Sequence, residues 1–365
     1  MKKASVDTSL ALLIAVLVFG GALIFASAAF GLLARGANHI PAVALRQVIW
    51  IATGLVALFI ASRIDYALWR RYAPHAFVLA LIATAAVFLP HIGIEHGGGR
   101  RWMALGGITV QPSEALKLGS ILIAAAYFAS IHARINDIRY GLGGLLAILA
   151  GPVLLLVMQP DLGTLSIIIL SVCAIFFAAG ANWRDLAILV ITGVLALALL
   201  AFFKPYVMDR IQVFFNPAQG QQAEGYQIKQ SLIAIGSGGF FGRGFGQGVQ
   251  KFTYLPEPMG DSIFAVAGEE FGLVGTCAII GLFLAFALRG LSTATKARDA
   301  FGTFLAIGIS VYLASEAFIN IGAMLGLGPL TGIPLTFISQ GGSAMLVSLA
   351  SAGVLLNVSR HRSRR

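Results

Sequence analysis

The apolar run LALLIAVLVFGGALIFASAAFGLL at residues 10–33 decides the fold class of this chain. Its 24 residues contain no charge, and about 20 apolar residues are enough for a helix to cross a bilayer. A signal-peptide core has about 7–15 apolar residues, and no clear cleavage site follows this run, so we expect a retained first helix. Nine further candidate spans follow, at 42–62, 74–92, 111–131, 142–159, 162–182, 185–203, 262–288, 300–324 and 334–358.

The composition supports an all-α polytopic membrane protein with about ten transmembrane helices. Hydrophobic residues make up 58% of the 365 residues and charged residues 11%, whereas soluble domains are roughly 45–50% apolar and about 25% charged. A soluble enzyme, a disordered chain and a collagen-like fibre are therefore excluded. The two cysteines, Cys173 and Cys277, lie in apolar runs and are interpreted as packing residues.

The distribution of basic residues predicts the orientation in the membrane. The formal charge is +10, which in a soluble protein would suggest a nucleic-acid partner. Here the excess of Lys and Arg in cytoplasmic loops explains it, so we expect no nucleic acid. With both termini in the cytoplasm, 15 of the 25 basic residues fall in inner segments. Residues 1–365 then form one membrane domain, and 204–261 is a large extracytoplasmic loop between the seventh and eighth helices.

This long loop is expected to be functional, because loops of such length in compact proteins usually are. Residues 226–235 predict a short helix within it, followed by the glycine-rich stretch 236–248. The stretch lacks the Lys-Ser/Thr of a P-loop and the strand–turn–helix context of a dinucleotide site. Neither a Cys/His metal spacing nor a serine-hydrolase motif is visible, so no nucleotide is predicted and no metal-ligand set is identified.

Ionisable residues at membrane depth are the first candidates for chemistry, because inserting each one costs about 2.5–3.5 kcal/mol. Glu114 and Lys117, in the stretch QPSEALK at 111–117, share a helix face and are expected to pair. A purely structural salt bridge and a functional pair are equally compatible with the sequence. Upstream, Trp102 is typical of an interfacial anchor, and Arg101 beside it would suit a phosphate.

Asp261 closes the long loop at the outer mouth of the eighth helix. Three interpretations are open: a helix N-cap, a solvated loop acid, or a general base at the outer leaflet. Arg243 and Lys251 lie earlier in the same loop and would suit an anionic lipid headgroup. Glu269 and Glu270 lie deeper, and we expect one of them to pair with a cation from another helix in a structural role. We expect Asp161 to be a helix cap.

Taken together, several short motifs resemble those of the SEDS family (shape, elongation, division and sporulation), the polytopic glycosyltransferases of bacterial cell-wall synthesis. The resemblance runs from the first helix to Ser359. The motifs are RW at 101–102, QPSEALK at 111–117, QPDLGT at 159–164, RIQVF at 210–214, NP at 216–217, AIGSGG at 234–239, LPE at 255–257, DSIFAV at 261–266, EE at 269–270, TGIPL at 331–335 and SQGGS at 339–343.

Within this family, GQGVQK at 246–251 before YLPE at 254–257 looks more like the cell-division branch, FtsW, than the elongation branch, RodA. Three positions depart from the family pattern. Met259-Gly260 stand where His-Thr often precedes the essential Asp, Gln340 stands at a frequent Tyr, and Thr336 stands at a family Pro. The Asp itself matches Asp261, so the expected chemistry is unaffected.

The resemblance implies polymerisation of lipid II into glycan strands at the outer leaflet of the bacterial inner membrane. Asp261 would act as general base, worth about 10²–10⁴-fold, and cations would meet the departing pyrophosphate, with a divalent ion able to share that load. It also implies a class B penicillin-binding protein as transpeptidase partner. The residues we assign to substrate binding are Arg101, Trp102, Gln111, Glu114, Lys117, Arg243, Lys251, Glu257 and Ser343.

Three alternatives remain open: a RodA-like polymerase for elongation, a lipid II flippase, and a scaffold that recruits the transpeptidase. A flippase or a scaffold has no need of a general base on the outer face. Asp261 is therefore the residue that separates these functions.

Overall fold

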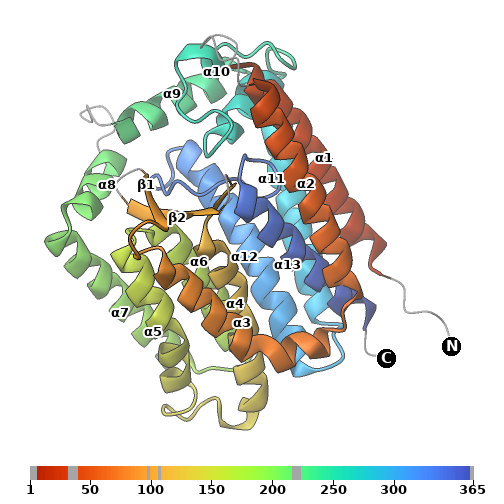
Figure 1. The fold of residues 1–365 in the computed structure, drawn as a ribbon, viewed down its shortest axis with the longest axis vertical. Helices are drawn as coiled ribbons and strands as arrows, with labels where there is room; N and C mark the ends of the chain where they lie inside the picture. Colours follow the sequence, from red (N-terminus) through yellow and green to blue (C-terminus); the bar gives the residue numbers. More distant parts are fainter. Residues whose placement is uncertain (1–5, 32–39, 97–98, 106–107, 216–222, 362–365) are drawn as a thin grey trace.

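The computed structural model describes residues 6–31, 40–96, 99–105, 108–215 and 223–361. In these residues the predicted all-helical architecture is confirmed, since each of the ten predicted spans corresponds to a helix (Figure 1). Those helices are α1 (Thr8–Ala29), α2 (Ile40–Arg63), α3 (Tyr66–Ala86), α4 (Pro112–Ser130), α5 (Leu142–Met158), α6 (Leu162–Ala178), α7 (Trp183–Phe203), α11 (Ile263–Ala294), α12 (Ala300–Met324) and α13 (Gly342–Arg360).

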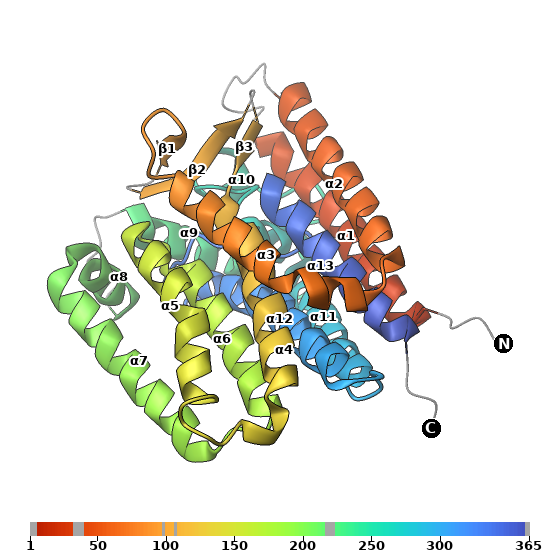
Figure 2. The same cartoon turned by 60° about the horizontal axis from the view of Figure 1, so that its bottom comes forward.

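Six of these helices, α1, α2, α7, α11, α12 and α13, are long and apolar enough to cross a membrane by themselves. The apolar helices α5 and α6 have 17 residues each, while α3 and α4 carry charges. Within the bundle, α12 lies at the centre, with 72% of its most apolar window buried, and α7 lies at the edge, with 6% buried (Figure 2).

The predicted spans differ most from the structure at α3 and at the start of α13. Helix α3 covers Tyr66–Ala86 instead of 74–92, with Asp65 as its N-cap. The sequence predicts a helix from residue 334, but the helix begins at Gly342. Gly332 and Phe337 adopt positive φ values of 66° and 64°, which a right-handed helix does not allow. Residues 331–341 therefore form a coil, and several of its side chains, including Ile333 and Leu335, are buried in the bundle.

A small sheet between α3 and α4 was not predicted. Its strands are β1 (Gly93–His96), β2 (Gly99–Leu105) and β3 (Ile108–Val110), paired antiparallel in the order β1-β2-β3. Trp102 pairs with Ile94, and Met103 pairs with Val110. These strands are too short and too irregular in polarity to show a period of two in the sequence.

In its described residues, the segment between α7 and α11 contains three helices, α8 (Pro205–Phe215), α9 (Ala223–Ser237) and α10 (Gln250–Thr253). The helix predicted at 226–235 is thus part of α9. Figure 1 shows α9 and α10 at one end of the molecule and both chain termini at the other. At the end with the termini, Asp7 accepts hydrogen bonds from Arg289 and from the backbone N–H of Leu10.

Helix α11 is interrupted at Gly272, which has φ 64° and ψ −161°. A Cβ at this position would lie 2.3 Å from the backbone N of Gly242 and 2.7 Å from the carbonyl O of Phe240. The glycine-rich stretch therefore approaches the break directly, and its carbonyl groups at Gly239 and Phe240 accept from Leu273 and Val274. The expectation that this long helix is tilted or broken is confirmed as a break.

Candidate active site

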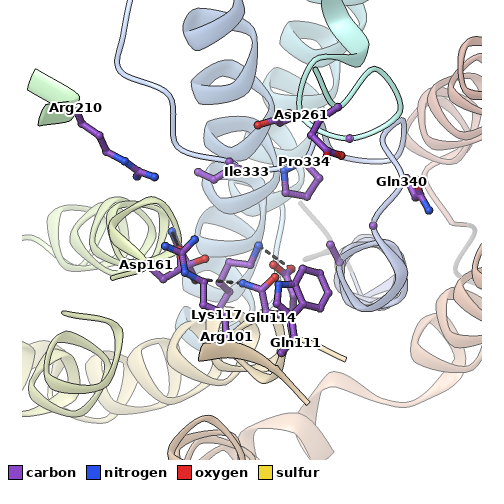
Figure 3. A pocket seen from close by; sticks show the side chains of 17 residues that line it. Arg101, Gln111, Glu114, Lys117, Asp161, Arg210, Asp261, Ile333, Pro334 and Gln340 are labelled. Atoms are coloured by element: carbon purple, nitrogen blue, oxygen red, sulfur yellow. Dashed lines mark hydrogen bonds and ion pairs between the residues drawn. The ribbon is translucent and has the colours of Figure 1, made fainter. Parts of the chain in front are cut away.

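A cavity of about 380 Å³ lies beside the sheet, since Arg101 and Trp102 of β2 line it (Figure 3). Seven of the ten predicted site residues line this cavity. They are far apart in the sequence, and the fold brings them together. Its lining residues are Arg101, Trp102, Gln111, Glu114, Lys117, Asp161, Thr164, Arg210, Glu257, Gly260, Asp261, Gly332, Ile333, Pro334, Gln340, Gly341 and Ala344.

Four helices begin at this cavity. Gln111, Asp161 and Gly341 are the N-cap residues of α4, α6 and α13, and Asp261 lies one residue before Ser262, the N-cap of α11. Each helix N-terminus carries a partial positive charge of roughly half a unit. The cavity is therefore suited to an anionic group beyond what its side chains provide.

Asp261 is held by its backbone and presents its carboxyl group to the cavity. Asn320 donates from Nδ2 to the carbonyl O of Asp261 at 2.8 Å, and Gln227 donates from Nε2 to Asp261 Oδ1 at 2.9 Å. Burial, and then the charge of Glu257, raises the pKa of the Asp261 carboxyl from 3.8 to about 6, while the bond from Gln227 acts in the opposite direction. A carboxylate with such a pKa is ionised at neutral pH and is a stronger base than an exposed one.

The alternative role of Asp261 as a helix cap is wrong, because Ser262 is the N-cap of α11 and makes no side-chain capping bond. The neighbouring loop is fixed from the opposite side by the coil before α13. Ser339 donates from Oγ to the carbonyl O of Gly260 at 2.6 Å, and the backbone N–H of Gln340 donates to Met259 at 2.7 Å. The Asp261 loop is therefore a fixed part of the fold.

The predicted pair of Glu114 and Lys117 is confirmed, with 2.8 Å between Lys117 Nζ and Glu114 Oε2. The sequence did not reveal a third member. Glu316, on α12, places Oε2 at 2.8 Å from the same Nζ. All three side chains are at most 3% exposed. The Lys117 ammonium is therefore already paired with two carboxylates before any substrate arrives.

Arg101 spans the base of the cavity and fixes the turn before α6. Its Nε donates to the carbonyl O of Gln159 at 3.0 Å, and its Nη2 donates to the carbonyl O of Pro160. Part of its hydrogen-bonding capacity is thus structural. Asp161, expected as a cap, does accept from the N–H of Thr164 at 3.2 Å, and it also accepts from Gln111 Nε2 at 3.1 Å.

Three of the predicted substrate-binding residues lie outside the cavity lining. Ser343 accepts a bond from the backbone N–H of Gln111 at 3.0 Å and so joins α13 to the start of α4. Lys251 is fully buried, 2.6 Å from Glu270 and 2.9 Å from Ser27 of α1. Arg243 lies 3.7 Å from Glu269. The pair of Glu270 with Lys251 of α10 confirms the structural ion pair expected for one of the two glutamates. The structure does not place Lys251 and Arg243 beside Asp261, since both have ion-pair partners on α11.

Arg210 of α8 lines the cavity, although it was not predicted as a site residue. Its position in the family motif at 210–214 could have indicated a functional role. Figure 3 shows its side chain extending from α8 toward Asp161. Within the described part of the chain, no group of three or more His, Cys, Asp or Glu side chains is placed to hold a metal ion.

These features define a polytopic membrane protein with a polar cavity near one end of its helix bundle, where a basic carboxylate faces arginine side chains. Comparison with known proteins places it more narrowly. The chain belongs to the FtsW/RodA/SpoVE family of cell cycle proteins, the SEDS family, whose model matches residues 7–364.

Individual relatives cover most of the chain. Stage V sporulation protein E of Bacillus subtilis (strain 168) is 38% identical over 87% of this chain and 87% of its own length. The probable peptidoglycan glycosyltransferase FtsW of Thioalkalivibrio sulfidiphilus is 37% identical over 97% of this chain and 89% of its own. That of Trichlorobacter lovleyi is 39% identical over 86% and 82%, respectively.

Solved structures show the same fold. The Thermus thermophilus rod-shape-determining protein RodA matches with a TM-score of 0.73 at 26% identity, over 99% of both chains. A chain from a structure described as the coordination of polymerisation and crosslinking by a peptidoglycan synthase complex matches with a TM-score of 0.80 at 26% identity, over 98% of both chains.

Proposed function

We propose that this protein is a peptidoglycan glycosyltransferase that polymerises lipid II into glycan strands during cell division. The observation that carries the proposal is Asp261, a carboxylate with a raised pKa in a polar cavity that arginine side chains share. The relatives named as probable peptidoglycan glycosyltransferases, and their FtsW assignment, support the substrate class and the division role.

In this reaction Asp261 accepts the proton of the acceptor hydroxyl as that oxygen attacks the anomeric carbon of the donor. The bond to the lipid pyrophosphate breaks at the same carbon, and the negative charge that leaves is stabilised by cations and backbone dipoles. Arg210 and Arg101 lie in the cavity lining for this purpose, and the N-termini of α4, α6 and α13 add partial positive charge. Lys117 contributes less than a free lysine, because two carboxylates already share its charge.

The remaining substrate contacts are assigned by position. Trp102, Gln111 and Glu257 line the cavity and are proposed to contact the sugar and peptide portions of lipid II. We place the cavity at the outer leaflet of the bacterial inner membrane, with both termini in the cytoplasm, as the charge distribution of the loops predicts. A class B penicillin-binding protein is the proposed partner, in line with the peptidoglycan synthase complex that shares this fold.

The test is polymerisation of purified lipid II by the purified protein, alone and with a class B penicillin-binding protein, with glycan strands resolved by gel electrophoresis. Asp261→Asn keeps the size of the side chain but cannot accept the proton at neutral pH, so strand formation should fall by at least about 10². Transfer of lipid II across vesicle membranes without strand formation would instead identify a flippase. Wild-type activity in Asp261→Asn would remove the catalytic assignment.

A further inference from the structure

The buried cluster of Glu114, Lys117 and Glu316 has one negative charge in excess when all three groups are ionised. Each carboxylate has an oxygen 2.8 Å from Lys117 Nζ, and the exposed fractions of the three side chains are 3%, 1% and 1%. All three residues lie on α4 and α12, two of the ten helices that correspond to the predicted spans. An uncompensated charge in such a place is costly, so a further positive charge is expected close by.

The second carboxylate oxygen of Glu316 indicates where this further positive charge would bind. Glu316 Oε2 faces Lys117, and the Tyr312 side chain also lies at this carboxylate. The buried Oε1 accepts no well-directed hydrogen bond among the described residues. Buried polar oxygens are nearly always satisfied, by protein, water or an ion. Glu316 also lines a second, small cavity, together with the hydroxyl-bearing residues Thr336, Ser339 and Ser348.

The size and lining of this second cavity restrict its occupant. The space available to the centre of a water-sized sphere is about 10 Å³, which is room for a single small particle. Its wall includes residues 334–337 of the coil before α13, and non-helical backbone at membrane depth is tolerated where it lines such a cavity. Coil of this kind, with its carbonyl groups outside a helix, is a common source of ligands for Na⁺ in membrane proteins.

We propose that this cavity is a binding site for one monovalent cation, Na⁺, held by Glu316 Oε1 with hydroxyl and carbonyl oxygens around it. A single positive charge neutralises the excess of the cluster. Mg²⁺ fits less well because it retains several waters, and Ca²⁺ requires six to eight oxygens. The site lies next to the main cavity, because Pro334, Gly341 and Ala344 line both spaces.

The experiment is equilibrium binding of radiolabelled Na⁺ to the purified, detergent-solubilised protein in choline chloride, with unlabelled NaCl as competitor. Wild type should bind about one displaceable Na⁺ per chain. Glu316→Gln retains the Lys117–Glu114 pair but removes the excess charge, and it should lose displaceable binding. The matched control is Glu95→Gln, an exposed glutamate on β1, which should bind as wild type does.

Ser348→Ala provides a second test that leaves every charge of the cluster in place. It removes one hydroxyl from the cavity wall, and it should weaken Na⁺ affinity several-fold while the protein remains folded. If Glu316→Gln fails to fold, this variant decides. Absence of displaceable Na⁺ in wild type, or undiminished affinity in Glu316→Gln or Ser348→Ala, overturns the proposal; a proton on Glu316 would then neutralise the cluster.

Discussion

As the pH is lowered, glycan polymerisation should lose activity at a higher pH than it would if the base were an aspartate with an unperturbed pKa. If Asp261 is the base, kcat/KM follows its ionised fraction in the free enzyme. A pKa of about 6 makes the carboxyl about 90% ionised at pH 7 and about 10% at pH 5. Activity should therefore fall about tenfold between these two values, whereas an unperturbed aspartate with a pKa of about 3.9 would remain ionised throughout.

The neighbours of Asp261 make the position of this acid limb testable. The charge of Glu257 raises the pKa of Asp261 and the hydrogen bond from Gln227 lowers it. Glu257→Gln should therefore move the acid limb to lower pH, and Gln227→Leu should move it to higher pH. The assay is the initial rate of lipid II polymerisation from pH 5 to 8, with Glu95→Gln as the control that leaves the limb in place. A wild-type limb near pH 4, or an identical limb in Glu257→Gln, would refute the assignment of Asp261 as the base.

The same pKa has a consequence for stability. Because folding raises the pKa of Asp261, its contribution to stability is present below pH 3.8 and is lost as pH rises through about 6. Asp261→Asn removes the charge whose burial is unfavourable, so at pH 7.5 its unfolding temperature should be no lower than that of wild type. Loss of a helix cap would instead cost about 1 kcal/mol, so a clear drop in unfolding temperature would contradict the structure.

Three further predictions concern the frame around the site. Lys251→Met leaves Glu270 buried without its cation and should destabilise the protein by about 3–5 kcal/mol, as measured by thermal unfolding. The double variant Lys251→Met with Glu270→Gln should recover most of this loss. Equal stability of the single and double variants would contradict the buried pair. Gly272→Ala places a Cβ 2.3 Å from the backbone N of Gly242 at a positive φ, so it should lower both unfolding temperature and activity, and unchanged values would argue against the helix break. Single cysteines at Lys229 and Thr295, in a background without the native cysteines, should respectively react and fail to react with an impermeant thiol reagent on intact cells; labelling at Thr295 would reverse the orientation.

The helices were predictable because each is encoded by a local run of apolar residues. The same local reading gave the pair of Glu114 and Lys117, which lie three residues apart on one helix face. Glu316 escaped because it is a single acid in an otherwise apolar run, and its cation lies 199 positions away in the sequence.

The position of Lys251 was mispredicted for a related reason. Both Lys251 and Asp261 lie in the long loop, and closeness in sequence suggested one site. Instead, the glycine-rich stretch packs against α11 at the break at Gly272, and Lys251 forms an ion pair with Glu270. The Lys251–Glu270 contact thus depends on the backbone geometry at Gly272, which the local sequence pattern does not reveal.

The convergence of four helix starts on one cavity also sets the order in which the site can come into existence. The chain emerges from the ribosome with α4 first, then α6, then α11, and α13 last. Gln340, Gly341 and Ala344, which form one wall of the cavity, lie at the start of this last helix. Until α13 has inserted beside α2, the carboxylate of Asp261 faces an incomplete enclosure. A partly synthesised or C-terminally truncated chain should therefore be inactive, and strand synthesis should begin only from molecules whose assembly in the membrane is finished.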